Sequence, residues 1–401
     1  MSGAPGTLAS LGGAPVRATF LPLARPSIGA REKQLVMETL ESGWITTGPR
    51  TEELGRRIAA LAGARHGLAV NSATGALHLA LAALGVGPGD EVVTPAYTFV
   101  ACVNVIEHVG ARPVLADVEP GTLCLDPRAV ERALSPRTKA VMPVDYGGQP
   151  CDHDAIGALA RARGAAVVED AAHALGARWR GRPVGSLADV TAFSFYATKN
   201  LTTGEGGAAV TDDDALAERM GLLSLHGMNR DAWKRYSDTG SWYYEVTAPG
   251  FKYNLSDVLA AIGLAQAERF EEMQRLRREH AGRYDALLAD VPEVRRPAAR
   301  EGAVHAWHLY AVALELERLR CDRARFIQEL RAENIGTSVH FIPIHYHPHF
   351  RGTLGGREGD FPVAEDAYRR AVTLPLFPDM TPRDVEDVVA AVRKVVGHYR
   401  R

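Results

Sequence analysis

One lysine of this chain could do chemistry because of the residues around it. Lys199 follows the apolar run "AFSF" and precedes two threonines and the stretch Gly-Glu-Gly-Gly at 204–207. The apolar run predicts a buried strand, and the glycines allow close approach of the backbone to a neighbour. A lysine between such segments faces a crevice, where loss of solvent lowers its pKa and makes the amine a nucleophile. The alternative is a surface lysine on a turn.

Two acidic residues end an earlier apolar run, "AAVVED" at 165–170. Glu169 and Asp170 lie there, with His173 three residues further on. Such a carboxylate can cap a helix or pair with a cation. It can also keep a pyridine nitrogen protonated, which turns that ring into an electron sink.

A third feature is the segment "VNSATGAL" at 70–77, which runs from a predicted strand into a helix. The unpaired N–H groups of a helix N-terminus can hold a phosphate, although Ser72 or Thr74 could serve only as the helix cap. An amine, an acid and a phosphate cradle on one parallel sheet match the aldehyde, ring nitrogen and phosphate of pyridoxal 5′-phosphate (PLP).

The segments that must position these residues alternate between Val/Ala-rich runs and helical patterns. The expected strands cover 67–70, 91–95, 112–118, 139–146 and 165–170, and the expected helices cover 74–84, 99–110, 126–134 and 153–164. Because the strands are apolar on both faces, helices should cover both sides of the sheet. The pattern predicts an α/β fold with a mostly parallel central sheet, which binds ligands beyond the carboxyl ends of its strands.

The pattern changes further along the chain. Residues 257–289 form one long helical stretch that begins apolar and becomes charged, as expected of a helix joining two domains. A strand at 308–314 and helices at 322–336 and 381–399 predict a smaller α+β domain. We expect a flexible tail over 1–20, a large domain over 21–265 and a small C-terminal domain over 266–401.

Composition disfavours several classes of protein. The 401 residues carry 46 Lys and Arg against 48 Asp and Glu, so neither nucleic acid nor a membrane is the expected partner. No apolar run approaches the roughly 20 residues that span a bilayer, and no signal-peptide pattern opens the chain. The four cysteines form no CxxC pair, so no zinc site or disulfide framework is indicated and a cytoplasmic location is expected.

Five segments in order carry a family resemblance. They are "VNSATGALHLAL", "GPGDEVVTPAYTFVA", "VEDAAHALGA", "FSFYATKNLTTGEGGAAVT" and "PGFKYNLSDVLAAIGLAQ". The chain resembles the PLP-dependent sugar aminotransferases of the DegT family, which have the aspartate-aminotransferase fold, PLP fold type I. The similarity covers about Leu21 to Val396, and five ordered segments are far more specific than one.

The resemblance implies roles around the cofactor ring. Lys199 matches the lysine that bonds to the PLP aldehyde and later moves protons, and Asp170 matches the acid on the pyridine nitrogen. His173 stands where the family often has glutamine near the ring hydroxyl. A histidine could donate the same hydrogen bond, with added pH sensitivity. Phe99 matches the aromatic residue that stacks on the ring.

Further matches concern the cofactor phosphate. Ser194 matches a phosphate-binding serine. Ala73 and Thr74 lie in the phosphate loop, where Ala73 replaces the usual glycine of the family. Asn254 matches an asparagine that reaches the phosphate of the neighbouring subunit. The resemblance therefore implies a homodimer with shared active sites.

The resemblance also implies a two-stage transamination. L-Glutamate would give its amino group to PLP, and the amine would pass to a keto sugar nucleotide, with Lys199 as base and acid. Lys199 argues against the deoxygenating branch of the family, where histidine replaces this lysine. "GFKYNLSD" and "LHGMNRDAW" look closer to enzymes that aminate carbon 4 of a dTDP-4-keto-6-deoxyhexose. The alternatives are UDP- or GDP-linked 4-keto sugars, 3-keto sugars and keto-cyclitols.

Four further residues are candidates for substrate contacts. Arg230 and Lys252 could bind a nucleotide diphosphate or could be solvated surface cations, and His340 or His345 could line the sugar pocket. His345, His347 and His349 alternate as metal ligands can. The prolines beside them and the lack of a nearby acid or cysteine argue against a metal, and none is expected.

A non-catalytic regulator with a PLP fold is the competing functional class. The chain shows no helix-turn-helix segment and no basic stripe that would bind DNA. A scaffold that acts by binding alone would not need both Lys199 and Asp170, so the pair favours an enzyme.

Overall fold

Seven strands form the central sheet of the protein. The computed structural model describes residues 6–228 and 243–401. The strand order is β1-β9-β8-β5-β4-β2-β3, and β9 is antiparallel to both neighbours while the other pairs are parallel. The strands are β1 (His66–Val70), β2 (Glu91–Pro95), β3 (Arg112–Ala116), β4 (Thr138–Val141), β5 (Ala166–Asp170), β8 (Val190–Ser194) and β9 (Gly207–Thr211). The predicted mostly parallel α/β sheet is confirmed.

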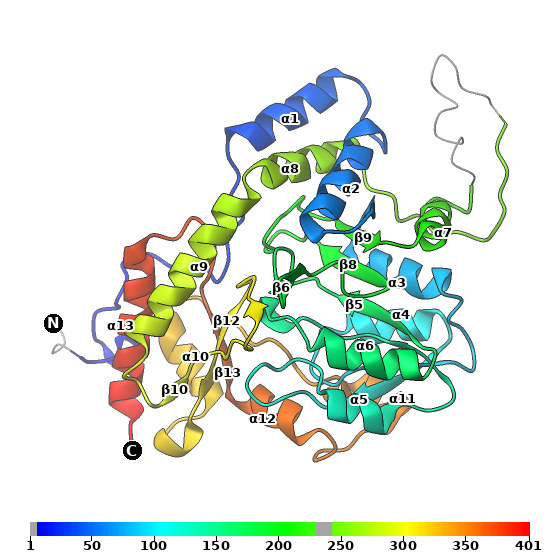
Figure 1. Ribbon diagram of the computed structural model, residues 1–401. Helices are drawn as coiled ribbons and strands as arrows, with labels where there is room; N and C mark the ends of the chain where they lie inside the picture. The colour runs from blue at the N-terminus through cyan, green and yellow to red at the C-terminus, as the bar shows by residue number, and fades with distance from the viewer. Residues whose placement is uncertain (1–5, 229–242) are drawn as a thin grey trace.

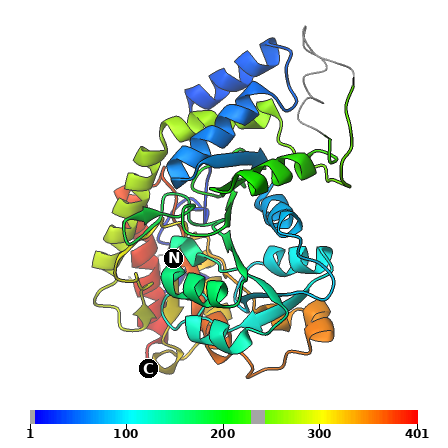
Figure 2. The ribbon, with the colours of Figure 1, turned by 45° about the vertical axis from the view of Figure 1, so that its right-hand side comes forward.

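Helices cover both faces of this sheet (Figure 1, Figure 2). One face carries α3 (Ala73–Ala83), α4 (Ala101–His108) and α7 (Asp214–Ser224), which share one apolar cluster with the strands. The other face carries α2 (Pro49–Ala62), α5 (Pro127–Ala133), α6 (His153–Ala162) and α8 (Asp257–Glu268). A further helix, α1 (Ala30–Glu41), packs on α8. The strands are apolar throughout because both of their faces are covered.

Side chains alternate along β5 and so reach opposite faces of the sheet. Val168 packs in the cluster of α3 and α4, whereas Val167 packs in the cluster of α5 and α6. Successive strand residues point to opposite faces. Asp170 therefore lies on the α3 and α4 side, and Glu169 lies on the α5 and α6 side.

The C-terminal region forms a smaller α+β layer. Its antiparallel sheet joins β10 (Val294–Arg295), β12 (Tyr310–Leu314) and β13 (Ala371–Leu374). The helices α9 (Phe270–Leu287), α10 (Arg323–Ala332) and α13 (Pro382–Tyr399) share one apolar cluster with this sheet, and α11 (Pro348–Leu354) and α12 (Pro362–Arg370) lie beside the large sheet. No helix in the described part of the chain is long and apolar enough to cross a membrane.

The single helix predicted over 257–289 is two helices in the structure. α8 ends at Glu268 and α9 begins at Phe270, because Arg269 has φ -118° and ψ 15°, outside helical geometry. The Arg269 guanidinium lies 2.8 Å from the Glu32 carboxylate and also binds the backbone of Ser27. At this break, the Arg269 side chain therefore reaches Ser27 and Glu32, at the start of α1.

The prediction of a loose tail over 1–20 is wrong for residues 6–20, which the structure describes. Leu8 is fully buried in the C-terminal apolar cluster. The Glu333 carboxylate accepts the N–H groups of Ala9 and Val16, both at 2.9 Å. Arg17 also pairs with Asp384 and Asp387 of α13. These partners lie far along the chain, so they give no local sequence signal.

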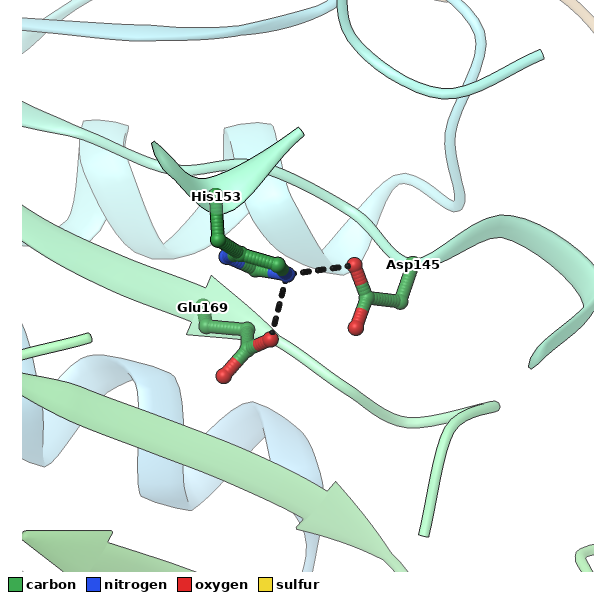
Figure 3. Close-up of side chains that lie close together, drawn as sticks. All are labelled: Asp145, His153 and Glu169. Carbon is green, nitrogen blue, oxygen red and sulfur yellow. Dashed lines mark hydrogen bonds and ion pairs between the residues drawn. The ribbon is translucent and has the colours of Figure 1, made fainter. Parts of the chain in front are cut away.

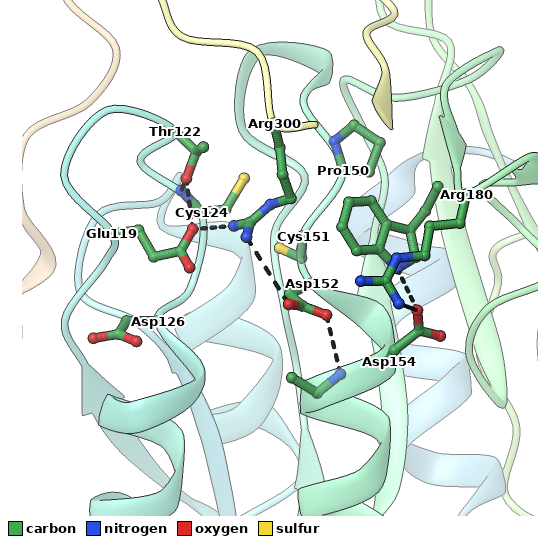
Figure 4. A network of polar contacts seen from close by, with 12 residues as sticks. Glu119, Thr122, Cys124, Asp126, Pro150, Cys151, Asp152, Asp154, Arg180 and Arg300 are labelled. Carbon is green, nitrogen blue, oxygen red and sulfur yellow. Dashed lines mark hydrogen bonds and ion pairs between the residues drawn. The ribbon is translucent and has the colours of Figure 1, made fainter. Parts of the chain in front are cut away.

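The two layers interlock through residues 300–308. The Arg300 guanidinium binds Glu119 and lies 4.0 Å from Asp152 (Figure 4). Beyond it, the strand β11 (Ala303–Val304) pairs with β6 (Arg178–Trp179) of the large layer. The N–H of His308 then donates to the carbonyl of Gly147 at 2.9 Å. These contacts fix His308 at the carboxyl ends of the central strands.

Candidate active site

A cavity of about 410 Å³ opens at the carboxyl ends of the central strands. Residues that follow β1, β2, β5 and β8 line it, together with His308 and the segment 340–341. Among the described residues, Lys199 is the only lysine or arginine in the wall. The wall contains many of the residues singled out in the sequence: Ala73, Thr74, Phe99, Asp170, His173, Ser194, Lys199 and His340.

Lys199 lies in the loop between the antiparallel strands β8 and β9. The hydroxyls of Thr202 and Thr203 donate to backbone carbonyls of the same loop, at 3.1 and 2.6 Å. Gly204 has φ +85°, in the left-handed region that favours glycine. The threonines and the glycine after Lys199 therefore fix the loop that carries the amine.

Burial governs the charge of Lys199. Burial lowers the pKa of Lys199 to about 8, and the carboxylate of Asp170 opposes this effect only in part. About half of the amine is therefore neutral at pH 8. A neutral amine can attack a carbonyl carbon, as the sequence predicted for this lysine.

Asp170 is held from two sides. The N–H of Ala172 donates to Oδ1 at 3.0 Å, and the Sγ–H of Cys102 donates to Oδ2 at 3.0 Å. Burial raises the pKa of the Asp170 carboxyl, and the two donors oppose the rise. The carboxylate is therefore oriented by one main-chain donor and one thiol.

His173 presents a hydrogen-bond donor to the cavity. The N–H of Gly147 donates to Nδ1 at 3.2 Å, so Nδ1 holds the lone pair and the neutral ring carries its proton on Nε2. Burial and the Lys199 ammonium lower the pKa of His173 well below its usual value. The pH sensitivity expected of a histidine here is therefore not supported near neutral pH.

His308 presents an acceptor beside His173, with the ring centroids 4.4 Å apart. Asn200 donates through Nδ2 to the carbonyl of Ala306 at 2.8 Å, which fixes the orientation of its amide. Its Oδ1 must then accept the Nδ1–H of His308 at 3.1 Å. Because burial lowers the pKa of His308, the ring is neutral and Nε2 holds a lone pair. The wall thus pairs a donor histidine with an acceptor histidine.

The N-terminus of α3 reaches the cavity because residue 207 is glycine. A Cβ at Gly207 would lie 2.4 Å from the backbone nitrogen of Ala73. Ser72 caps the helix, since its Oγ accepts a backbone N–H of α3 at 2.9 Å. Ala73 and Thr74 lie in the wall next to this cap. A helix N-terminus with its positive dipole end is suited to bind a phosphate.

Two further predicted residues lie in the wall. Phe99 is 56% exposed, and its ring centroid lies 6.0 Å from that of Phe341. His340 places Nδ1 at 2.8 Å from the Thr373 hydroxyl, and burial lowers its pKa to about 4. Phe99 thus offers a ring face to a ligand, and His340 offers a neutral imidazole.

Two predicted residues lie beside the cavity wall and not in it. The Asn254 amide donates to the hydroxyl of Thr47 and accepts from the ammonium of Lys252. Asn254 also forms a β-bridge with Val70, at the end of β1. Asn254 and Lys252 are therefore a hydrogen-bonded pair at the carboxyl end of β1.

The predicted sugar contact His345 lies away from Lys199. Its side chain is fully buried, and Nε2 lies 3.0 Å from the Glu365 carboxylate. His349 pairs with a different glutamate, Glu107, at 2.7 Å. The alternating histidines therefore serve separate contacts. Arg230 lies outside the described residues.

Sequence reasoning missed several residues of the site, among them Cys102, His308 and Phe341. Cys102 comes from α4, and the other two come from the C-terminal layer, far along the chain from Lys199. Of these three, Cys102 alone had a sequence signal, because it follows the predicted cofactor residue Phe99 at the start of a helix. His308 enters through the interlock of residues 300–308, and Phe341 enters through the separate segment 340–341.

The cavity thus combines a nucleophilic amine, a buried carboxylate and a helix N-terminus. The sequence profile of the DegT/DnrJ/EryC1/StrS aminotransferase family matches residues 26–393. The chain belongs to this family. The match spans both layers of the fold, and the predicted family membership and enzyme class are confirmed.

Several members of the family are similar to this chain over nearly its whole length. The spore coat polysaccharide biosynthesis protein SpsC of Bacillus subtilis is 51% identical over 94% of this chain and 97% of its own length. Spr1654 of Streptococcus pneumoniae, assigned as a sugar aminotransferase, superposes in its PLP form with a TM-score of 0.88 at 34% identity. The superposition covers 94% of this chain and 99% of the Spr1654 chain. DesI, solved with its TDP-sugar product, gives a TM-score of 0.87 at 32% identity and covers 98% of each chain.

PLP is the cofactor of this family, and Spr1654 has been solved in both PLP and PMP forms. The predicted PLP fold type I and the cofactor are confirmed by these relatives. The residues of the cavity fit this group. They include an amine, a carboxylate and a helix N-terminus, which are the groups that an aldehyde, a ring nitrogen and a phosphate require.

Proposed function

We propose that this protein transfers the amino group of L-glutamate to a keto sugar nucleotide, at carbon 4 of a dTDP-4-keto-6-deoxyhexose. The observation that carries the proposal is the buried pair of Lys199 and Asp170 in one cavity. PLP, when bound, supplies an electron sink for the substrate carbon. The chain supplies binding, orientation and proton transfer.

Lys199 is the proposed nucleophile and proton carrier. Its lowered pKa leaves part of the amine neutral near pH 8, so it can bond to an aldehyde and later accept and return a proton. Asp170 would hold the ring nitrogen protonated, and the donors on its two oxygens favour the required carboxylate form. The Nε2–H of His173 would donate to the ring hydroxyl.

The remaining cofactor contacts follow from the positions of the wall residues. The hydroxyls of Thr74 and Ser194 and the N–H of Ala73 would bind the phosphate at the N-terminus of α3. Phe99 would stack on the ring with its exposed face. These contacts need no arginine, which agrees with the composition of the described wall.

We further propose a homodimer with shared active sites. Asn254, which lies beside Val70 at the carboxyl end of β1, would reach the phosphate in the partner subunit. Exposed apolar side chains on and after α1 support a covered surface there. Met37, Leu40 and Ile45 are exposed by 53%, 49% and 53%.

The nucleotide and the carbon position rest on similarity. DesI has a TDP-sugar product, and SpsC takes part in polysaccharide biosynthesis. The segments "GFKYNLSD" and "LHGMNRDAW" support amination at carbon 4. UDP- or GDP-linked 4-keto sugars, 3-keto sugars and keto-cyclitols are the alternative acceptors.

The substrate contacts follow from charge. The described wall holds one cation, Lys199, which the cofactor engages. The diphosphate would therefore be bound from outside the wall, by Lys252 and Arg230. His340 would contact the sugar. We leave His345 out of the proposed set because it is buried against Glu365.

A panel of acceptors tests this proposal. The PLP-loaded protein is given L-glutamate with dTDP-, UDP- and GDP-4-keto-6-deoxyhexoses, a 3-keto sugar nucleotide and a keto-inositol, and 2-oxoglutarate formation is measured. We expect the highest kcat/KM with the dTDP-4-keto sugar. A preference for another acceptor would overturn the substrate assignment. Turnover of none, with intact PLP binding, would favour the non-catalytic regulator.

A further inference from the structure

Cys102 is a buried thiol in the first turn of α4, next to Asp170. Its Sγ lies 3.0 Å from Oδ2 of Asp170 and 3.2 Å from the hydroxyl oxygen of Thr98. An ionised carboxylate can only accept hydrogen bonds, so the S–H must donate to Asp170. The Thr98 O–H then donates to a sulfur lone pair. The contacts form a chain of two hydrogen bonds, in which Thr98 donates to Cys102 and Cys102 donates to Asp170.

The other buried thiols make a different contact. Cys124 and Cys151 each lie 3.2 Å from a backbone carbonyl oxygen. In the part of the chain that the structure describes, Cys102 is the only cysteine that donates a hydrogen bond to a carboxylate. Cys102 thus differs from the two buried thiols that bind a backbone carbonyl.

We propose that Cys102 is a positioning residue that holds the Asp170 carboxylate ionised and oriented toward the nitrogen of the bound cofactor. The inference rests on the proposed role of Asp170. Each carboxylate oxygen receives one donor, from Ala172 and from Cys102. A thiol is a weak donor, so the carboxylate keeps most of its negative charge for the interaction with the cofactor nitrogen. Without the thiol, one buried oxygen would lose its donor.

Burial and hydrogen bonding oppose each other at this carboxylate. Burial raises the pKa of Asp170, and the Cys102 hydrogen bond is the largest contribution that lowers it. Removing the donor should therefore raise the pKa of Asp170 further. The acidic limb of any rate that needs ionised Asp170 should then move to higher pH.

Two substitutions separate this role from packing. Cys102→Ser keeps a donor in a smaller side chain, whereas Cys102→Val fills the space without a donor. In single turnovers of the PLP-loaded protein with L-glutamate, we expect Cys102→Val to react about tenfold more slowly, as loss of a charged hydrogen bond predicts. The acidic limb of its pH–rate profile should move to higher pH. The L-glutamate concentration that gives half the maximal single-turnover rate should change little. Cys102→Ser should stay within about threefold of wild type.

A packing role predicts the reverse order, with valine tolerated and serine impaired. Cys124→Val is the matched control, because it removes a buried thiol bonded to the carbonyl of Gln149. We expect wild-type rates for it. Thermal unfolding of each variant shows whether a slow variant is folded. A folded Cys102→Val variant with wild-type rate and pH profile would overturn the proposal.

The infrared S–H stretching band gives a second test in cofactor-free protein. The Cys102 band, obtained as wild type minus Cys102→Val, should lie at lower frequency than the Cys124 band and should rise in Asp170→Asn. Coincident bands, or no response to Asp170→Asn, would overturn the hydrogen bond itself. This test needs no turnover, so its failure is distinct from a failure of the proposed function, which would appear as wild-type protein that does not react with L-glutamate.

Discussion

At the scale of single residues, burial sets the charge of the cavity groups. Lys199 moves from an ordinary pKa of 10.5 to about 8. This shift corresponds to about 3 kcal/mol in favour of the neutral amine. The attraction of Asp170 acts in the opposite direction and is the smaller effect. The loop threonines matter for the same reason, because a buried amine must be held in place to act as a nucleophile.

His173 should act as a donor that does not titrate near neutral pH. Its Nδ1 accepts from Gly147, and its pKa lies well below the usual value. We expect His173→Gln to retain kcat/KM within about threefold, because the amide keeps a donor, and His173→Phe to lose about tenfold.

The pH profile of kcat/KM between about pH 6 and 8 checks this account. Wild type and His173→Gln should have profiles of the same shape in this range. A limb near the ordinary histidine pKa that is present in wild type and absent in His173→Gln would show that His173 does titrate.

Residues of the site were predictable where chemistry leaves a local pattern. Asp170 ends an apolar strand, and Lys199 lies in the loop between an apolar strand and a glycine-rich stretch. His308 and Phe341 reach the cavity only through tertiary contacts of the C-terminal layer. His345 shares the alternation of its neighbours, yet it pairs with Glu365 from α12. Spacing along an irregular segment does not determine which partner a side chain meets.

At the scale of elements, β5 places two adjacent acids in opposite environments. Asp170 reaches the cavity, whereas Glu169 joins His153 and Asp145 in a buried cluster (Figure 3). Nε2 of His153 lies 2.9 Å from Glu169 and 3.2 Å from Asp145. Oδ2 of Asp145 has no hydrogen-bond donor. A proton on Asp145 would let this carboxyl donate a hydrogen bond to Glu169.

The cluster should make folding stability depend on pH. Burial raises the pKa of Asp145 to about 6, and His153 opposes the rise. The folded pKa lies above the ordinary 3.8, so this stabilisation is present below about pH 4 and is lost as pH rises through about 6. Asp145→Asn mimics the protonated acid at every pH. From pH 5 to pH 7.5, the free energy of unfolding of the variant should rise by about 1 kcal/mol relative to that of wild type.

Urea unfolding at these two pH values measures the gain. Asp290→Asn is the control, because Asp290 is an exposed aspartate paired with Arg393 and its pKa is lowered. It should show no comparable gain with pH. An equal pH dependence of wild type and Asp145→Asn would contradict a shared proton in the cluster.

The elements themselves were largely predictable, and the exceptions have physical causes. Val/Ala-rich runs and glycine stops define the strands and helices up to Asp170. β4 ends at Val141, earlier than predicted, and Pro143 beyond it has no N–H for a ladder. The helix break at Arg269 and the ordered N-terminal segment depend on Glu32 and Glu333. Such distant partners leave no local periodicity.

At the scale of the whole molecule, the site depends on contacts between layers and, in the proposed dimer, between subunits. Residues 300–308 bind the large layer through Arg300, β11 and Gly147, and they deliver His308. Asn254 lies beside the cavity wall, and in the proposed dimer it would bind the cofactor phosphate of the other subunit.

Shared sites predict complementation between two inactive variants. Lys199→Ala and Asn254→Ala are each expected to lose most activity, but a mixed dimer would contain one intact site. After denaturation and joint refolding, about half of the dimers are mixed, so activity should return to about one quarter of wild type. Separately refolded samples that are then mixed without exchange are the control. Activity no higher than this control would contradict shared sites.

We propose that Lys199 binds PLP and mediates amino transfer from L-glutamate. The absorbance spectrum of the PLP-loaded protein before and after L-glutamate, for wild type and for Lys199→Ala, tests this role. We expect a visible band of lysine-bound PLP in wild type that converts to the pyridoxamine form, and neither feature in Lys199→Ala. The same band in Lys199→Ala, or no band in wild type, would contradict the assignment of Lys199 and of the cofactor site.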